Sequence, residues 1–208
     1  MSEARRGAVT RWLERAPAPA FAAFAIAGAF TAYFCMYGFR KPFTAAAWPG
    51  TLDLGVLPAI DLKIAFILAQ VLGYCASKFL GIKVISEMGG GRRGAAIVGL
   101  IAVAEVALVG FALTPAPWSA LWLVVNGLPL GMVWGLVFGF LEGRRLSEVL
   151  GAGLSASYIV ASGFVKTVGR WLLAAGVPEA WMPALAGACF LPALGVAVWM
   201  LQQLPPPS

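Results

Sequence analysis

The chain has 208 residues, of which 61% are hydrophobic and only 12% are charged, with a formal net charge of +6. A soluble domain typically carries about 25% charged residues, so this composition and a mean hydropathy of +0.86 indicate an integral membrane protein. The basic residues fall between apolar segments rather than on one patch, so no nucleic-acid partner is expected. Histidine is absent, which excludes His-based proton relays, Ser–His catalysis and His metal sites.

Six apolar segments approach the ~20 residues that a helix needs to cross a bilayer. They predict an all-α fold of six transmembrane helices at 19–43, 61–81, 94–113, 119–141, 150–173 and 181–204. We expect a cytoplasmic N-terminal segment at 1–18, a membrane bundle at 19–204, and the start of a cytoplasmic linker or tail at 205–208.

The distribution of Lys and Arg predicts the orientation of these helices, because cytoplasmic loops carry an excess of both residues. On one side of the membrane the loops carry few basic residues, mainly Lys63 and Arg170 at helix ends. The residues expected together on the other side are Arg5, Arg6, Arg11, Arg15, Lys83, Arg92, Arg93, Arg144 and Arg145. Both termini are therefore expected in the cytoplasm.

The first segment ends in the most informative stretch of the chain, YFCMYGFRKPFT, in which Arg40 and Lys41 follow the aromatic pair Tyr33 and Tyr37. No charged residue lies between Arg15 and Arg40. An Arg at the end of such a run is costly unless it lies at the interface or faces a wet cavity. Two interpretations stay open here: these residues bind an anion inside the bundle, or they anchor the helix at the membrane surface.

Polar residues in the second and fifth segments indicate further inward-facing positions. Gln70, Tyr74 and Lys78 recur at i, i+4 and i+8, so they share one helical face. We expect this face to contact a solute; in the alternative, Lys78 extends to the cytoplasmic surface. Lys166 lies in the outer half of the fifth segment and is expected to face inward, because exposure to lipid would be costly.

Glu105 is an isolated acid about halfway along the third segment. We expect it to pair with a cation and balance its charge; the alternative is a group that carries a proton. If Arg40, Lys78 and Lys166 converge, the cavity is positive and suits an anionic solute. If these three cations do not converge, each one anchors its own helix locally.

The fourth segment contains five glycines spaced every four residues: Gly127, Gly131, Gly135, Gly139 and Gly143. Stacked small residues let helix backbones approach closely. We therefore interpret this ladder as a packing or sliding face rather than a binding site.

Catalytic constellations are not recognisable in the sequence. Ser155 follows a Gly-Ala-Gly-Leu run that superficially resembles a nucleophile loop, but no base is available to it. The three cysteines, Cys35, Cys75 and Cys189, lie singly in apolar segments, so neither disulfides nor a metal site are expected. We expect no enzymatic activity, no cofactor and no metal.

The pattern around Tyr33, Tyr37, Arg40 and Lys41, together with the later Tyr-x-x-Ser-Lys-Phe segment at Tyr74, resembles the organophosphate–phosphate antiporter branch of the major facilitator superfamily. A longer set of motifs resembles a poorly characterised bacterial family of unknown function in that superfamily. These motifs are FRKPFTAA, GYCASKFLGIKVISEM, NGLPLGMVWGLVFGFLEGRRLSE and WMLQQLPPPS.

This resemblance implies two inverted three-helix repeats in a bacterial inner-membrane transporter, with Arg40 binding substrate phosphate and Lys78 near the same cavity. The chain departs from the superfamily pattern in its second loop, where residues 81–88 read GIKVISEM. It also holds six predicted helices where superfamily members have twelve. We therefore expect an N-terminal half whose partner is a second six-helix bundle, either a missing C-terminal half or a second copy. The alternatives are a stand-alone substrate-binding module and a membrane assembly protein.

Overall fold

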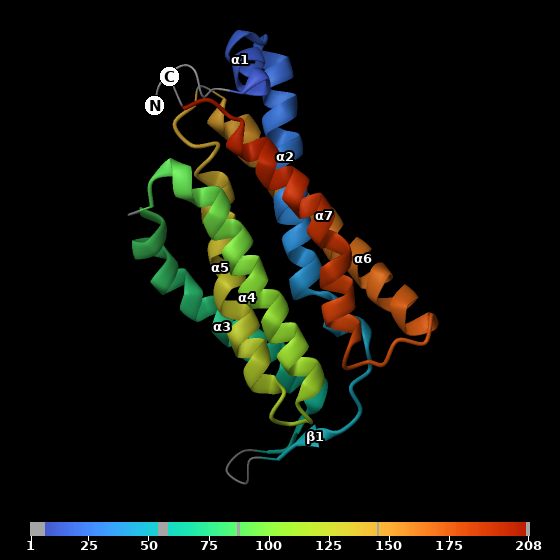
Figure 1. The fold of residues 1–208 in the computed structure, drawn as a ribbon. Coiled ribbons are helices and arrows are strands. Elements are labelled where there is room, and N and C mark those ends of the chain that lie inside the picture. The colour runs from blue at the N-terminus through green and yellow to red at the C-terminus, as the bar shows by residue number, and fades with distance from the viewer. Residues whose placement is uncertain (1–6, 54–57, 87, 145, 207–208) are drawn as a thin grey trace.

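The computed structural model describes residues 7–53, 58–86, 88–144 and 146–206, and these form a bundle of long helices (Figure 1). Six of the helices are long and apolar enough to cross a membrane, which confirms the predicted class of membrane protein. The helices are α1 (Ala8–Arg15), α2 (Ala18–Arg40), α3 (Leu62–Ser86), α4 (Arg93–Leu113), α5 (Ala120–Phe138), α6 (Ser147–Ala174) and α7 (Met182–Gln202).

The long helices pack as two groups that lie side by side in Figure 1. In one group α5 packs along both α3 and α4, and in the other α2 packs along both α6 and α7. Contacts of α2 with α5 and of α4 with α7 join the groups. The shared core is apolar and includes Met36, Phe39, Ile101, Leu130 and Phe190.

The beginning and the end of the chain's described part meet on one side of the bundle. Thr10 Oγ1 donates a hydrogen bond to Gln203 Oε1 at 3.2 Å. Arg144 Nη2 donates to the Pro205 carbonyl at 2.6 Å, and its guanidinium lies 5.1 Å from the ring centroid of Phe21. We call this the terminal side; the α3–α4 and α5–α6 connections also lie there, as Figure 1 shows.

The opposite side carries a small β ladder that the all-α prediction did not include. β1 (Thr51–Leu52) pairs antiparallel with β2 (Ile60–Asp61). A short 3-10 helix, η2 (Pro42–Ala45), leads toward this ladder from the end of α2. The Trp48 indole, on a residue with φ of 53°, donates a hydrogen bond to the Phe43 carbonyl at 2.6 Å and fixes the turn between them.

Several helix ends differ from the predicted ones. α2 ends at Arg40 rather than at residue 43, because Pro42 has no N–H to continue the helical ladder. α3 continues through Gly81 to Ser86. The helix α1 was not predicted; it lies in the segment expected to precede the bundle, with Leu13 buried and Trp12 packed edge-on against Phe24.

The glycine ladder of α5 divides into parts with different roles. A Cβ atom at Gly127 would overlap the Gln70 carbonyl oxygen and lie 2.8 Å from the Tyr74 nitrogen, so α3 and α5 touch there through their backbones. Gly131 faces Ser77 in the same way, which agrees with a packing face. Gly143 differs: it follows the helix in a turn, with φ of 76°, and does not extend the face.

The contact at Gly127 leads to a stability prediction. Gly127→Ala should lower the free energy of unfolding in detergent by about 1–3 kcal/mol, because the added methyl group would push apart two backbones. The matched control is Gly99→Ala in α4, where nothing lies within 4 Å of the new methyl group. Equal stability of the two variants would show that α3 and α5 do not touch at Gly127.

A cation cluster at the end of α2

The end of α2 is capped by side chains from two other helices. Gln70 Nε2 donates hydrogen bonds to the Arg40 carbonyl at 3.0 Å and to Asn126 Oδ1 at 2.8 Å. Asn126 Nδ2 donates to the carbonyls of Phe39 at 3.3 Å and Ala104 at 3.0 Å. The last carbonyls of a helix lack partners within it, so these amides from α3 and α5 satisfy two of them where water is excluded.

This capping places the Arg40 backbone at mid-depth in the bundle. Gln70 is the ninth residue of the 20-residue span Leu62–Gly81, and Ala104 is the twelfth of the 21-residue span Arg93–Leu113, counting from each first residue. Arg40 lies level with both through the hydrogen bonds above. Arg40 therefore lies among the helices of the described bundle, and its role, either anion binding or anchoring of the helix at the membrane surface, stays a prediction.

The Arg40 side chain points at the aromatic face of α3. Its Cζ atom lies 4.0 Å from the ring centroid of Tyr74 and 5.7 Å from that of Tyr37. Its Nε atom is buried and has no hydrogen-bond partner in the described structure. A stacked guanidinium can still donate hydrogen bonds from its edge, so the Nε–H of Arg40 is a buried donor without an acceptor in the described structure.

Lys78 approaches the same tyrosine, one turn further toward the terminal side. Its Nζ atom lies 4.9 Å from the Tyr74 ring centroid. Two cations therefore share one aromatic ring, an arrangement stabilised by the negative face of the ring. The predicted common face of Tyr74 and Lys78 is present.

Lys41 and Lys166 extend this group toward α6. Lys41 directly follows Arg40, is half-buried and lies within interaction range of Lys166. Lys166 is also half-buried. We call Arg40, Lys41, Lys78 and Lys166 the cation cluster; none of them forms an ion pair with a described carboxylate.

Tyrosines complete the surroundings of the cluster. Tyr33 and Tyr37 pack edge to face, with ring centroids 5.7 Å apart. Both lie within interaction range of Tyr74, and Tyr37 also of Tyr158 on α6. Tyr158 was not among the predicted site residues. Its spacing of eight residues from Lys166, about two helical turns, indicates that both lie on the same face of α6.

Two predicted site residues have surroundings other than those expected. Gln70 is only 4% exposed, and its amide nitrogen donates hydrogen bonds to the Arg40 carbonyl and to Asn126 Oδ1. These bonds hold the end of α2 in position and leave this nitrogen no bond to a solute. Glu105 does not form the expected ion pair: its Oε2 atom is buried, lacks a partner, and lies beside Gly187 of α7 and the Phe39 ring. Asn126, fully buried, was missed as a site residue, although an isolated amide in an apolar segment was a usable signal.

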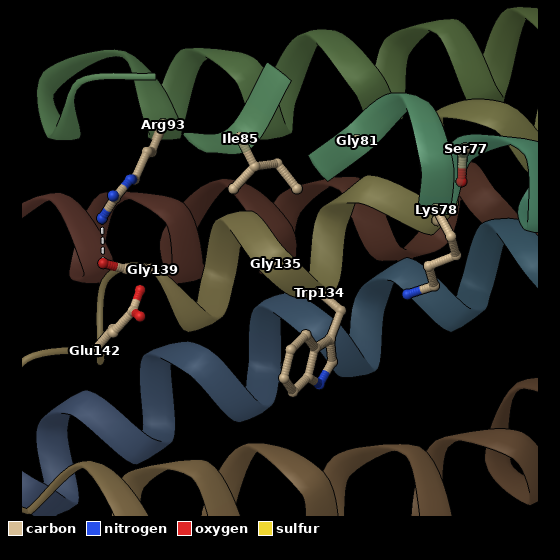
Figure 2. A pocket seen from close by; sticks show the side chains of 10 residues that line it. Ser77, Lys78, Gly81, Ile85, Arg93, Trp134, Gly135, Gly139 and Glu142 are labelled. Atoms are coloured by element: carbon tan, nitrogen blue, oxygen red, sulfur yellow. Dashed lines mark hydrogen bonds between the residues drawn. The ribbon is translucent and has the colours of Figure 1, made fainter. Parts of the chain in front are cut away.

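A cavity of about 490 Å³ opens on the terminal side of the cluster, between α3 and α5 (Figure 2). Lys78 and Ile85 contribute from α3, Arg93 from the start of α4, and Trp134 with Gly135 from α5. Arg93 Nη1 donates a hydrogen bond to the Gly139 carbonyl, while its Nε atom is buried without a partner. The cavity thus extends from Lys78 to Arg93, a second arginine whose Nε atom is buried without a partner.

Comparison with known families assigns the chain to one of them. Residues 42–208 match a family of unknown function, DUF5690, and the chain belongs to this family. No curated protein and no solved structure matches the chain. Because the family description assigns no activity, the inference of function depends on the geometry of the site.

The amide pair provides a direct test of how α2 is held. Gln70→Leu and Asn126→Leu should each lower the free energy of unfolding by about 1–3 kcal/mol, because each leaves buried polar groups without partners. In a double-mutant cycle the two changes should be coupled by about 0.5–3 kcal/mol.

The control for this cycle is Ser157→Ala. Ser157 is buried, but its hydroxyl bonds only to the Leu154 carbonyl of its own helix, so its loss should cost less and be additive with either change. Strict additivity of Gln70→Leu and Asn126→Leu would contradict the amide bridge.

Proposed function

For this member of DUF5690, we propose that the chain is the N-terminal six-helix half of a secondary transporter that moves a small anionic or phosphorylated solute by alternating access. The observation that carries the proposal is the cation cluster at mid-depth, with the buried Nε of Arg40 lacking an acceptor. Buried cations without counter-charges are costly and mark solute pathways in membrane proteins. An oxyanion would supply both the charge and the acceptor.

Each residue of the cluster has a role that follows from its geometry. Arg40 would hold the oxyanion through its planar donor edge, which suits carboxylate and phosphate. The Tyr74 ring keeps the guanidinium in place, and Lys78 adds a second charge on the same ring. Lys41 and Lys166 would attract the anion from the side of α6. Binding and release of this kind involve no covalent step.

The helix pairings support two inverted three-helix repeats. If α2, α3 and α4 are exchanged with α5, α6 and α7, the contact of α2 with α7 becomes that of α5 with α4. The contact of α3 with α5 becomes that of α6 with α2, and the α2–α5 and α4–α7 contacts map onto themselves. Equivalent helices run in opposite directions across the bundle, as expected of repeats in transporters that rock around a central site.

A second six-helix bundle, either the missing C-terminal half or a second copy, would close the cavity over the cation cluster. We place the protein in the bacterial cytoplasmic membrane with the terminal side in the cytoplasm, following its excess of Lys and Arg. The backbone contact of α3 with α5 at Gly127 would let this half rotate as a unit. The size of the native polypeptide, measured with an antibody to the N-terminal segment, distinguishes a longer protein from a second copy.

Uptake measurements test the role of Arg40. In cells that express the native protein, Arg40→Gln should lower the uptake of labelled organic phosphates or carboxylates at least about 30-fold, the effect of losing a buried charged hydrogen bond of about 2 kcal/mol or more. The control, Arg170→Gln, removes an exposed cation from the same bundle and should leave uptake unchanged. Protein levels in the membrane should be equal.

Normal uptake by the Arg40→Gln variant would overturn the transport proposal. If Gly135→Leu then disrupted a complex, the chain would be a membrane assembly protein. Tight solute binding by the purified chain without a second bundle would instead indicate a stand-alone binding module.

A further inference from the structure

We infer that the cavity between α3 and α5 is a second oxyanion site, distinct from Arg40 and nearer the terminal side of the bundle. The inferred site rests on side chains that the sequence analysis did not assign to binding, Arg93 and Trp134, together with Lys78. The inference that the transported solute also binds in this cavity rests on the proposed function. The inference that the cavity binds an oxyanion does not.

The hollow arises from the way α3 and α5 diverge. Their backbones touch at Gly127 and Gly131. Further toward the terminal side, Gly135 faces only the tip of the Ile85 side chain, 2.8 Å from where its Cβ would lie. Gly139 faces the Arg93 guanidinium, with Cζ 2.9 Å from such a Cβ. Glycines at these two positions leave a volume of about 490 Å³, enough for a small organic anion.

The donors in the cavity are incompletely satisfied. Arg93 reaches from the start of α4 to the Gly139 carbonyl, as Figure 2 shows, and uses Nη1 for that bond. Its Nε atom is buried and has no acceptor. Lys78 Nζ, from the other wall, forms no ion pair with any described carboxylate. Arg93 and Lys78 lie at opposite ends of the cavity (Figure 2), so the oxyanion would bind at Arg93 while Lys78 attracts it from the other end.

The remaining walls narrow the ligand class. Glu142 lies at the cavity edge beside Gly139 (Figure 2), so an anion with several charges would be repelled there. A single carboxylate or phosphate that also carries a hydroxyl or amino group would donate to the Glu142 carboxylate. The Trp134 indole offers an apolar face for the rest of the molecule.

Lys78 connects the cavity with the cation cluster. It lines the cavity and also lies 4.9 Å from the Tyr74 ring that Arg40 covers at 4.0 Å. An oxyanion could therefore pass from Arg40 to Arg93 without leaving the reach of a positive charge. This gives the solute a path through the terminal half of the bundle.

Trp134 provides the measurement. The purified chain in dodecyl maltoside is titrated with inorganic phosphate, and the part of the tryptophan fluorescence that is lost in Trp134→Phe is recorded. We expect a saturable change. Arg93→Gln should raise the apparent Kd about tenfold or more, the effect of losing one charge-assisted hydrogen bond. Lys78→Gln should raise the Kd less, because Lys78 acts on the phosphate through its charge from the other end of the cavity.

Two control variants separate phosphate binding in this cavity from phosphate binding elsewhere on the chain. Arg92→Gln removes the same charge one residue from Arg93, from an exposed side chain outside the cavity, and should leave the Kd unchanged. Arg40→Gln should also leave it unchanged, so the inferred site can survive if the role proposed for Arg40 fails. Lys78 is exposed, so Lys78→Gln should fold even if Arg93→Gln, which loses the bond to Gly139, does not.

Nanodiscs distinguish the source of the oxyanion. If phosphatidylglycerol bilayers abolish the phosphate response seen in detergent, a lipid headgroup occupies the site; if the response persists, the site takes a soluble anion. The inference is overturned if phosphate causes no Trp134-dependent change in detergent. It is equally overturned if Arg92→Gln weakens binding as much as Lys78→Gln does.

Discussion

The hydrogen bonds from Gln70 and Asn126 to the last carbonyls of α2 are the constraint on which the site depends. A helix that ends inside a membrane bundle exposes acceptors that lipid cannot satisfy. Here two amides from α3 and α5 satisfy the carbonyls of Phe39 and Arg40, and Asn126 also bonds to Ala104 of α4. Four helices are thereby joined at one level. The position of Arg40 follows from this arrangement. Its backbone is fixed at mid-depth, so its side chain lies in the interior of the bundle.

Electrostatics then limits what this interior can hold. The cation cluster has aromatic rings for neighbours but no described carboxylate partner, and Glu105 lies near Gly187 and the Phe39 ring with its Oε2 unsatisfied. Aromatic faces stabilise the half-buried Arg40 and the exposed Lys78 but leave their positive charges in place. The proposed anion would supply the missing counter-charge and acceptor. In the cavity, the Nε atom of Arg93 is likewise buried without a partner, so the proposed solute could serve both Arg40 and Arg93.

The sequence predicted the features that depend on local pattern. Six apolar segments set the class, and the spacing of Tyr74 and Lys78 placed both on one face. The depth of Arg40 was not predictable, since it depends on hydrogen bonds between residues 30 and 87 positions apart in the chain. The hydrogen bonds of Gln70 to the end of α2 and to Asn126 were not predictable for the same reason, because a polar residue on an inward face can bind either a solute or a helix end. By contrast, α1 could have been found, because Val9 precedes Trp12 by three residues and Leu13 by four, which is the spacing of an apolar helical face.

The charge selectivity of the interior is the most direct test of this account. Tyr74→Cys, in a chain whose three natural cysteines are replaced by serine, puts a thiol between Arg40 and Lys78 while keeping every cation. Its rate of reaction is compared for an anionic and a cationic methanethiosulfonate of similar size, with a cysteine at the exposed α4 residue Val103 as the lipid-facing control. Faster reaction with the anionic reagent, and little reaction at Val103, is the predicted result. No reaction at residue 74, or faster reaction with the cationic reagent, would contradict a water-accessible positive site at the end of α2.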